Sequence, residues 1–499
     1  MLQRFDVHPH AALLDTASLR ELERRLAKEQ ATHPMVLAGR ATRQLALAVA
    51  PHAQRCWVAA GPGNNGGDGL EAAWNLHTRG VKVTVTLLSS PEKLPADAHA
   101  AWQRAIAAGV QVIDSVPPWL SSLDKRDICI DALLGIGASR AVQGQMLQAV
   151  HALNSCAAQV LALDVPTGLN AHSGQALDEN GRLHSVVHAD HTLTFLAGKP
   201  GLFMGHGRDA CGQIWLDTLA SAKSAAHASV HPVAERNPAA RSLTARHAGH
   251  KGLHGDVAIL GGESLSSRGM GMGGACLLAA SAALHAGAGR VMLSWLGGQP
   301  EHLPEHPDLM LRRVDKLEME SLTTVCGCGA GAAVEDTLPE VLQRSHRLVL
   351  DADALNAIAR TPQLGLALAQ RPAGSTVLTP HPLEAARLLG LDVPQVQADR
   401  LQSAQSLARQ FNCVVVLKGS GTVIADPVHT PRINTSGNGL LSIGGTGDVL
   451  AGLIGARMGQ GLSGFEAASA AVWQHGHTAD LWPPGLALTA SRLARHLTR

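Results

Sequence analysis

The 499-residue sequence lacks an excess of charge of either sign. It contains 41 Lys and Arg residues against 40 Asp and Glu residues, whereas nucleic acids and anionic membranes are bound by proteins with a basic surplus. The charge balance therefore argues against a nucleic-acid or membrane partner. A continuous membrane-spanning stretch is also lacking, because His285, Gly287 and Arg290 interrupt the most apolar segment, residues 275–297.

Paired cysteines and a secretory leader are missing as well. Eight Cys residues are spread along the chain, and the one close pair, Cys326 and Cys328, has one intervening residue instead of the two found in zinc knuckles and redox pairs. The first ten residues hold no apolar signal core, so we expect a cytoplasmic protein with reduced thiols. His247, His250 and His254 are not expected to bind a metal, because no carboxylate or thiol joins them at ligand spacing.

What the sequence does contain is a repeated alternation of strand and helix patterns. Apolar residues make up 45% of the chain, as in globular proteins, and the length suits two large domains or three smaller ones. A surface helix is expected at residues 17–30. Apolar strands are expected at residues 55–60, 81–88, 127–135, 158–168 and 191–197, with a helix at 69–80. Such alternation predicts a parallel sheet with helices on both faces.

The alternation lapses once, at residues 221–245, where an Ala-, Ser- and Pro-rich stretch shows neither a period nor a strand. It then restarts, with strands expected at residues 255–262, 289–296, 322–329, 347–352, 374–381 and 413–419. Roughly the last 55 residues have a helical pattern. The sequence therefore predicts two α/β domains, residues 1–222 and 236–499.

Polar residues follow three of the strands expected in the first half. They are Asn64, Asn65 and Asp68 after the strand at 55–60, then Asp131, and finally Asp164 with Thr167. Because ligands of open α/β sheets bind at the carboxyl ends of the strands, we expect these residues to converge on one edge. Their carboxylate, amide and hydroxyl oxygens suit a hard cation. The alternative is that Asp131 and Asp164 cap the helices that follow their strands.

The glycines of the first loop, Gly61, Gly63 and Gly66, have the spacing of a dinucleotide-binding turn. A dehydrogenase with such a turn places an acidic residue at the end of its second strand, where it holds the ribose hydroxyls. Here that strand ends in Thr-Leu-Leu-Ser-Ser-Pro, residues 86–91, which contains no acid. An ordinary dehydrogenase cofactor loop is therefore disfavoured.

Three segments resemble the NAD(P)H-hydrate epimerase family: GPGNNGGDG at 61–69, DALLGIG at 131–137 and LALDVPTGLNAHSG at 161–174. The resemblance covers roughly residues 10–220 and implies a Rossmann-like three-layer α/β/α domain. In that family the asparagine-rich loop binds a hydrated nicotinamide nucleotide, which is the reactant and not a hydride donor. The implied substrate contacts are Asn64, Asn65, Gly66, Gly67, Asp68, Gly135, Ile136, Gly137, Ala138, Ser139, Arg140, Ala141 and Asp164.

The same resemblance implies more specific roles. Asp164 would be the catalytic residue at the reacting ring, residues 135–141 would contact phosphate, and Asn65, Asp131 and Thr167 would hold a K⁺ ion. Thr167 replaces the family's usual Ser and keeps its hydroxyl. The segment PMVLAGRA at residues 34–41 departs further, because the family usually shows a Met-Glu pair there.

Two glycine-rich turns stand out in the second half. Lys418 ends an expected strand and precedes residues 419–422, whose free backbone N–H groups would form an anion nest. Residues 444–447 open a helix, where small residues allow phosphate binding, and Asp448 in its first turn would be kept ionised as a general base. The alternative is a flexible turn with a capping Asp. No G-x-x-x-x-G-K-[ST] motif occurs, which excludes a P-loop NTPase.

Gly-x-Gly-Asp at a helix start resembles the ribokinase-like fold, here of the α/β/α type, and five ordered motifs resemble the ADP-dependent NAD(P)H-hydrate dehydratases over roughly residues 240–499. The motifs are HKGLHGDVAILGG (250–262), GMGGACLLAASAALHAGAGRV (271–291), DADALN (351–356), LTPHPLEAARLLG (378–390) and VVVLKGSGTVIAD (414–426). The implied hydrate contacts are Ala275, Gly331, His381 and Asp448, and the implied ADP contacts are Lys418, Gly419, Ser420, Gly421, Thr422 and Gly447. Leu383 replaces a Gly, and GCGAG at 327–331 replaces Gly-Pro-Gly-Leu-Gly.

Together the resemblances imply a bifunctional repair enzyme for hydrated NADH and NADPH. The first domain would interconvert the R and S hydrates. The second would phosphorylate the S hydrate's hydroxyl with ADP and Mg²⁺, Asp448 taking the proton, so that AMP and phosphate are released and NAD(P)H returns. We expect small-molecule partners and a homo-oligomer. The alternative is a ribokinase-like small-molecule kinase fused to a non-catalytic nucleotide-binding module.

Overall fold

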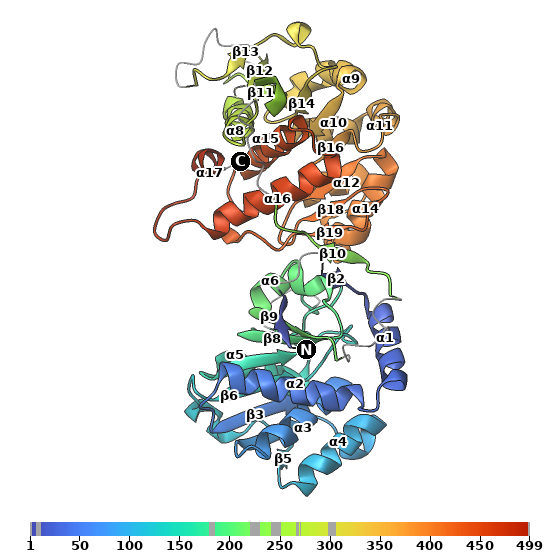
Figure 1. Ribbon diagram of the computed structural model, residues 1–499, viewed down its shortest axis with the longest axis vertical. Coiled ribbons are helices and arrows are strands. Elements are labelled where there is room, and N and C mark those ends of the chain that lie inside the picture. Colours follow the sequence, from blue (N-terminus) through green and yellow to red (C-terminus); the bar gives the residue numbers. More distant parts are fainter. Residues whose placement is uncertain are drawn as a thin grey trace. The chain divides into compact units, whose positions relative to one another are not determined.

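The computed structural model describes residues 2–5, 11–178, 185–219, 230–240, 251–265, 269, 271–297 and 306–497. The chain forms two compact units, Met1–Glu235 and Arg236–Arg499 (Figure 1). Of the helices in these ranges, none has the length and apolar character needed to cross a bilayer. His247, His250 and much of the stretch at 221–245 lie outside the described residues.

The first unit is built on a sheet with strand order β1-β9-β8-β7-β6-β3-β4-β5. Its strands are β1 Gln3–Arg4, β3 Arg55–Ala60, β4 Lys82–Leu87, β5 Gln111–Ile113, β6 Ile128–Ala132, β7 Gln159–Leu163, β8 His191–Phe195 and β9 Gln213–Asp217. All neighbours from β5 to β9 are parallel, and β1 is antiparallel to β9. The chain moves from β3 to β4 and β5 on one side, then returns to β6 on the other. Ligands of open α/β sheets bind at such a reversal of strand order.

Helices cover both faces of this sheet. They are α1 Thr16–Glu29, α2 Pro34–Val49, α3 Asn64–His77, α4 Ala96–Ala107 and α5 Gly144–Ser155. Successive residues of a strand point to opposite faces, so Cys56, Val58 and Ala60 pack with α1 to α4, whereas Trp57 and Ala59 pack on the side of α5. The predicted α/β class with a helix-covered parallel sheet is confirmed for this unit.

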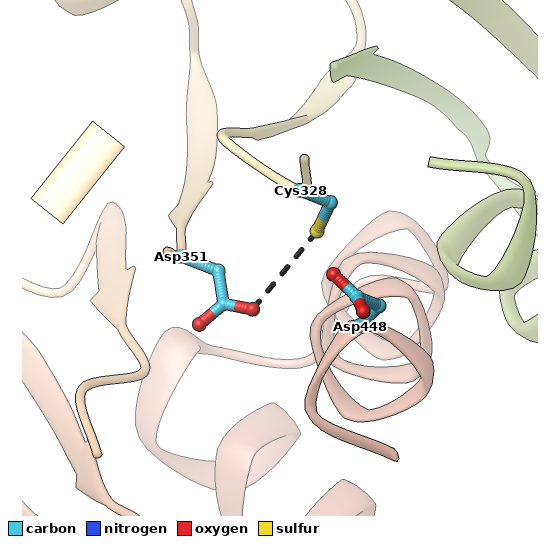
Figure 2. A group of neighbouring side chains, drawn as sticks. All are labelled: Cys328, Asp351 and Asp448. Carbon is cyan, nitrogen blue, oxygen red and sulfur yellow. Dashed lines mark hydrogen bonds between the residues drawn. The ribbon is translucent and has the colours of Figure 1, made fainter. Parts of the chain in front are cut away.

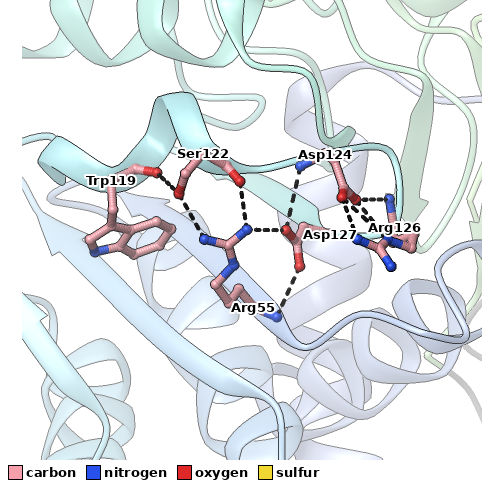
Figure 3. Close-up of polar contacts among 6 residues, drawn as sticks. All are labelled: Arg55, Trp119, Ser122, Asp124, Arg126 and Asp127. Atoms are coloured by element: carbon pink, nitrogen blue, oxygen red, sulfur yellow. Dashed lines mark hydrogen bonds and ion pairs between the residues drawn. The ribbon is translucent and has the colours of Figure 1, made fainter.

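A polar network ties β3 to β6 at their amino ends, away from the edge where ligands bind (Figure 3). The backbone N–H of Arg55 donates to Asp127 Oδ1 at 3.1 Å, and its guanidinium donates to Asp127 Oδ2 at 2.9 Å and to the Ser122 carbonyl at 2.7 Å. Asp127 is buried. Its loss would leave these donors unpaired, so the network fixes the alignment of the two strands that flank the reversal point.

The second unit has a sheet with strand order β13-β12-β11-β14-β15-β16-β17-β18-β19. The strands are β11 Asp256–Glu263, β12 Arg290–Gly297, β13 Met310–Leu311, β14 Thr323–Cys326, β15 Arg347–Leu350, β16 Thr376–Leu378, β17 Val414–Leu417, β18 Val423–Ala425 and β19 Arg432–Ile433. Pairing is parallel from β13 to β17 and antiparallel from β17 to β19.

Two groups of helices enclose the second sheet, which confirms the predicted α/β class here too. One group is α8 Gly273–His285, α15 Thr446–Gly459, α16 Gly464–Asp480 and α17 Ala490–His496, which share one core with alternate residues of β11 to β17. The other group is α9 Val334–Arg344, α10 Asp353–Arg360, α11 Pro362–Ala369, α12 Pro382–Leu389, α13 Val393–Ala398 and α14 Arg400–Phe411. In this group α9 and α14 lie against β14 and β17, and the others pack onto them.

The sequence had predicted that the stretch at 221–245 contains no strand, and this prediction is wrong. Residues Ala234–Arg236 form β10, and Ala234 and Glu235 pair in antiparallel register with Leu13 and Ala12 of β2, Ala12–Leu13. Such short strands carry too few residues for a periodic pattern. Their structure comes from backbone pairing with a distant segment, which the local sequence does not reveal.

Candidate active sites

The loop after β3 starts α3 without using its polar side chains as caps. Gly63 is the N-cap residue and no side chain caps the helix. A Cβ on Gly61 would lie 1.8 Å from the Leu133 carbonyl oxygen, and one on Gly66 would lie 2.1 Å from the Gly61 oxygen. These glycines therefore permit close backbone packing. The amide oxygen and nitrogen of Asn65 are buried without a hydrogen-bond partner in the protein, which is rare in folded proteins and makes this side chain a candidate binding group.

Asp131, at the end of β6, joins the loops that follow two strands. Its carboxylate accepts hydrogen bonds from the Thr167 N–H at 2.8 Å, the Thr167 hydroxyl at 2.7 Å and the Leu133 N–H at 3.2 Å. Burial raises the pKa of Asp131 to about 6, although the bonds from Thr167 oppose the shift. The capping alternative for Asp131 is wrong, because Gln143 is the N-cap of the following helix, α5.

Asp164 lies at the end of β7 and forms an ion pair with a buried lysine. Lys199 Nζ donates to Asp164 Oδ1 at 2.5 Å, to Thr194 Oγ1 at 2.8 Å and to the Phe195 carbonyl at 2.7 Å. Burial lowers the pKa of Lys199, against the opposing charge of Asp164. The φ of Asp164 is 67°, a left-handed conformation that costs about 1–3 kcal/mol in a non-glycine residue and that is concentrated at functional sites. Asp164 does not cap a helix either, since the next α-helix along the chain is α6 Gly207–Ala210.

A cavity of about 540 Å³ brings these groups together. Its lining includes Asn64, Asn65, Asp68, Asp164, Lys199, the turn at 135–138 and three residues of α1, Leu19, Arg20 and Glu23. A Cβ on Gly135 would lie 3.2 Å from Asp164 Oδ2 and 3.4 Å from Asn65 Cγ, so both side chains border the same point. Gly66, Gly67, Asp131, Ser139, Arg140, Ala141 and Thr167 are not part of this lining.

The second cluster forms at the carboxyl ends of β14, β15 and β17. Cys328, Asp351 and Asp448 approach one another with their sulfur and carboxylate oxygens within 4.8 Å (Figure 2). Lys418 Nζ and Thr379 Oγ1 each donate to Asp351 Oδ1 at 2.8 Å. Burial lowers the pKa of Lys418, but the charges of Asp351 and Glu384 outweigh it and the pKa is raised.

Asp448 occupies the first turn of α15, and its N-cap is Gly445 with φ 91° and no side-chain cap. The capping alternative for Asp448 is therefore wrong. Burial, and then the charge of Asp351, raise the pKa of Asp448 to about 6. The helix dipole, from which an ionised Asp448 was expected, acts in the opposite direction to this burial. A carboxyl of this kind is still mostly ionised at neutral pH, and a base is most effective when its pKa lies near the working pH.

Arg400, a residue that the sequence analysis had not singled out, forms hydrogen bonds to the backbone next to the glycine-rich turn at 419–422. Gly419 and Gly421 have φ values of 142° and 68°. The buried Arg400 guanidinium donates to the carbonyls of Leu417 at 3.1 Å and Lys418 at 3.3 Å. On the other side of Lys418, a Cβ on Gly447 would lie 3.3 Å from Nζ. The lysine thus stands between the two turns for which phosphate contacts are expected.

His381 caps the N-terminus of α12 with one nitrogen of its ring. Its Nδ1 accepts from the N–H groups of Leu383 at 3.1 Å and Glu384 at 3.2 Å, and Glu384 Oε2 accepts from the His381 N–H. This reciprocal capping assigns the proton to Nε2. Burial raises the pKa of Glu384 to about 7.

Gly331 and Ala275 lie near the same edge of the sheet. Gly331 has φ 61°, and a Cβ there would lie 2.4 Å from the Glu263 carboxylate, so only glycine fits. Its N–H donates to Asp353 at 2.9 Å. Ala275, in the first turn of α8, is buried against the turn at 327–331, where a Cβ on Gly329 would lie 2.8 Å from its own Cβ.

Sequence reasoning had missed Lys199, Asp351, Cys328 and Arg400. Lys199 follows β8 as the expected residues follow their strands, so the same strand-end criterion would have found it. Asp351 and Cys328 lay inside quoted motifs without a role. Arg400 reaches the nest from a helix and has no local signal.

Comparison with known proteins finds relatives of both units. A family model described as YjeF-related protein N-terminus matches residues 32–201, and one described as NAD(P)H-hydrate dehydratase matches residues 257–499. The bifunctional NAD(P)H-hydrate repair enzyme Nnr of Escherichia coli strain K12 is 36% identical over 460 residues, covering 90% of this chain and 84% of that protein. The chain belongs to the family of bifunctional NAD(P)H-hydrate repair enzymes.

Relatives of the second unit alone are also found. The ADP-dependent (S)-NAD(P)H-hydrate dehydratase of Neisseria meningitidis serogroup B is 40% identical over 259 residues, covering 49% of this chain and 83% of that protein. A solved structure of the ADP/ATP-dependent NAD(P)H-hydrate dehydratase of Bacillus subtilis, co-crystallised with ATP and Mg²⁺, is 30% identical. It covers 51% of this chain and 91% of that one, with a TM-score of 0.43.

Proposed function

We propose that the first unit interconverts the R and S hydrates of NADH and NADPH, and that the second unit dehydrates the S hydrate with ADP, releasing AMP and phosphate. The observation that carries this assignment is that each unit has its own polar cluster at the carboxyl edge of its own sheet. Asn65, Asp68 and Asp164 mark the first, and Asp351, Lys418 and Asp448 mark the second.

In the first unit the hydrate occupies the cavity at the carboxyl ends of β3, β6 and β7. Hydration of an enamine places the hydroxyl on the carbon beside the ring nitrogen, so that carbon must be inverted. Asp164, which is ion-paired with Lys199, stands at the reacting ring, and residues 64–68 hold the nucleotide. Residues 135–141 contact its phosphates. Arg20 lies beside this turn, because its Nη2 is 3.5 Å from the position of a Cβ on Gly137.

The residues beside the cavity fit a K⁺ ion. The Asn65 amide oxygen is buried and unpaired, and the Asp131 carboxylate and Thr167 hydroxyl are bonded to each other nearby in the fold. These are oxygen donors of the type that hard cations prefer. We assign Asn65, Asp131 and Thr167 as its ligands. The bound ion would supply a fixed positive charge at the reversal point of the sheet.

In the second unit Asp448 takes the proton of the hydrate's hydroxyl as ADP phosphorylates it. Phosphate is then a better leaving group than hydroxide, and its departure restores the ring double bond. Lys418, residues 419–422 and Gly447 hold the ADP phosphates, while Ala275, Gly331 and His381 contact the hydrate. Mg²⁺ sites combine nucleotide phosphates with one or two carboxylates, and Asp351 is the carboxylate that fits. The ion would neutralise phosphate charge.

We further propose that residues 1–222 and 236–499 fold and act independently, that the protein is a cytoplasmic homo-oligomer, and that no nucleic acid or membrane takes part. The eight cysteines are all free thiols, in keeping with a reducing compartment.

The test is recovery of NADH absorbance from separately prepared R and S hydrates. With ADP, the S hydrate should yield NADH, AMP and free phosphate at once, and the R hydrate should follow after epimerisation. A stable phosphorylated product without NADH would instead indicate a small-molecule kinase. An R hydrate consumed no faster than by spontaneous epimerisation would indicate a non-catalytic first unit.

A further inference from the structure

Helix α1 supplies a wall of the first cavity, a role beyond that of the surface helix predicted from sequence. The helix buries Leu19, Leu22 and Leu26 in the core of the unit. Glu23 is four residues after Leu19 and three before Leu26, so it falls within this apolar stripe. Its side chain is half-buried and lines the cavity together with Asp164 and Lys199.

Glu23 has no partner within the described part of the chain, since it forms no hydrogen bond and no ion pair there. The same holds for Asp68. The nearby Lys199 donates its three hydrogen bonds to Asp164, Thr194 and Phe195, and none to Asp68. Two carboxyl groups are thus left uncommitted in one cavity. Carboxyls in natural folds are seldom left in this state without solvent or a ligand to satisfy them.

The charges around Glu23 favour a carboxyl that keeps its proton. Burial raises the pKa of Glu23, and the charge of Asp164 raises it further, while His33, Lys199 and Asp97 have weaker effects. Burial, Asp164 and Glu23 likewise raise the pKa of Asp68 well above its usual range. Among the described residues that line the cavity, Lys199 is the one buried cation beside three carboxyl groups, so the cluster retains a proton that a substrate could receive.

Inversion at the hydroxyl-bearing carbon needs both a proton donor and a proton acceptor. Protonation of the hydroxyl lets the C–O bond break with its electron pair on the departing water, and the ring nitrogen's lone pair forms a planar iminium. Water then adds to the opposite face, a new C–O bond forms, and a carboxylate takes the proton of the added water. One proton is given and one is returned, so the step balances without a further reactant.

We propose that Glu23 is a second acid–base residue of the epimerase site, acting from helix α1 while Asp164 acts from the end of β7. The proposal rests on the epimerase function assigned to this cavity. Asp68 is the competing candidate, but it belongs to residues 64–68, which are assigned to hold the nucleotide. Glu23 comes from the second half of α1, lines the same cavity and has no other assigned role.

The experiment uses the full chain and compares Glu23→Gln with Glu21→Gln. Glu21 is on the same helix but forms surface ion pairs with Arg24 and Arg25, so it is a matched control. With R hydrate and excess ADP, NADH recovery is limited by epimerisation. With S hydrate, the same protein reports the second unit, an internal control. The spontaneous epimerisation rate is subtracted.

We expect Glu23→Gln to reduce kcat for epimerisation about 100-fold or more, as loss of a positioned acid–base group does, with little change in KM. Glu21→Gln should match the wild type, and S hydrate turnover should be unchanged in both. Glu23→Asp, which keeps the carboxyl group, should retain more activity than Glu23→Gln. The pH profile of Glu23→Gln should lose the titration that the wild type shows above the usual glutamate range.

Glu23→Gln with a near-normal rate and an unchanged pH profile would overturn the proposal, provided that Asp164→Asn is inactive. If the titration disappears in Asp68→Asn and persists in Glu23→Gln, the proposal is overturned and Asp68 is the acid–base residue. If Asp164→Asn also kept the wild-type rate on R hydrate, the failure would lie with the assignment of this cavity as the epimerase site. Equal loss in Glu23→Asp and Glu23→Gln with a lowered thermal midpoint would indicate a packing role and would also overturn it.

Discussion

Both sites contain a buried lysine–aspartate ion pair, and they differ in the other carboxyl groups that lie beside the pair. In the first unit the buried Lys199 pairs with Asp164, and in the second Lys418 pairs with Asp351. Each lysine forms an ion pair with one carboxylate at the carboxyl edge of its sheet. Beside the first pair stand Glu23 and Asp68 without partners in the described residues. Beside the second pair stands Asp448, while the nearby Glu384 already accepts a hydrogen bond from the His381 N–H.

The number of carboxyl groups beside each pair matches the number of protons that each reaction must move. Removing one proton from a hydroxyl during phosphoryl transfer needs one base, and Asp448 has a pKa raised to about 6 by burial and by Asp351. Inversion needs a donor and an acceptor, and the first site has spare carboxyl groups for both. In each site a lysine pairs with one carboxylate, and burial raises the pKa of other carboxyl groups beside the pair.

The largest expected effect is that of Asp448→Asn on dehydration. The two side chains are nearly isosteric, so the start of α15 should survive and only the proton acceptor is lost. We expect turnover of S hydrate to fall about 10²–10⁴-fold, with ADP binding by calorimetry nearly unchanged. Near-normal turnover would mean that the base of the second site lies elsewhere and that the comparison of the two sites is wrong.

Asp131→Ala should cripple epimerisation and abolish its K⁺ dependence, because the carboxylate is the charged ligand among neutral oxygens. We expect a loss of about 100-fold, the upper end for residues that support a metal site. Dehydration of pure S hydrate should be intact. The variant also frees the N–H groups of Leu133 and Thr167, so Asp131→Asn is the matched control for packing. Retained, K⁺-dependent epimerisation in both variants would refute the cation assignment.

Lys418→Ala should weaken ADP binding and slow dehydration together. A hydrogen bond to a charged group contributes about 1.5–3 kcal/mol, so ADP affinity should fall roughly 10- to 150-fold by calorimetry. Lys418 also lowers the pKa of Asp448. Its removal should therefore move the acidic limb of the pH profile upward, a shift that a loss of phosphate contacts alone would not cause.

The pH dependence of dehydration follows from the sign of the shift on Asp448. The base works when ionised, and its pKa is raised to about 6. Turnover of S hydrate should be constant above this value, halved near pH 6, and about tenfold lower for each further unit of acid. A profile flat down to the usual range of an aspartate would show that the base is not buried beside a second carboxylate.

The smallest effect concerns the separation of the units. Fragments 1–222 and 236–499 should each be soluble and active, the first on R and S hydrates and the second on S hydrate. Ending the first fragment at 235 keeps Ala234 and Glu235 paired with β2. Each backbone hydrogen bond of this pairing contributes about 0.5–1.5 kcal/mol to the free energy of unfolding. Fragment 1–235 should thus resist denaturant slightly better than 1–222. If neither half is active alone, the two-enzyme organisation fails.

Much of the fold was predictable because its central strands are continuous apolar runs. The run at 55–60 is β3 itself, and β4, β6, β7 and β8 lie within the runs expected for them. β5 and β9 were not expected from the sequence. Short edge strands such as β2, β10 and β19 were not predicted, because two or three residues carry no period and pair only when distant segments meet.

The sites were predictable where a polar residue directly follows a strand. Asp131 and Asp164 were found in this way. Lys199 follows the expected strand at 191–197 and meets the same criterion, but it was not singled out. Glu23 stands in the apolar stripe of an amphipathic helix, a position that a charged residue occupies only with a reason. That signal was present in the sequence and was not used. The partner of each carboxylate could not be predicted, because ion pairs between distant strands depend on tertiary packing.

A complementation assay tests the central claim of two separate sites most directly. Asp164→Asn and Asp448→Asn are each given R hydrate with ADP, alone and mixed in equal amounts, and NADH recovery is followed. We predict that neither variant alone repairs R hydrate above the spontaneous rate of epimerisation, that Asp164→Asn still dehydrates S hydrate, and that the mixture restores repair of R hydrate. A mixture that remains inactive, or an Asp164→Asn variant that has also lost S hydrate turnover, would contradict the account.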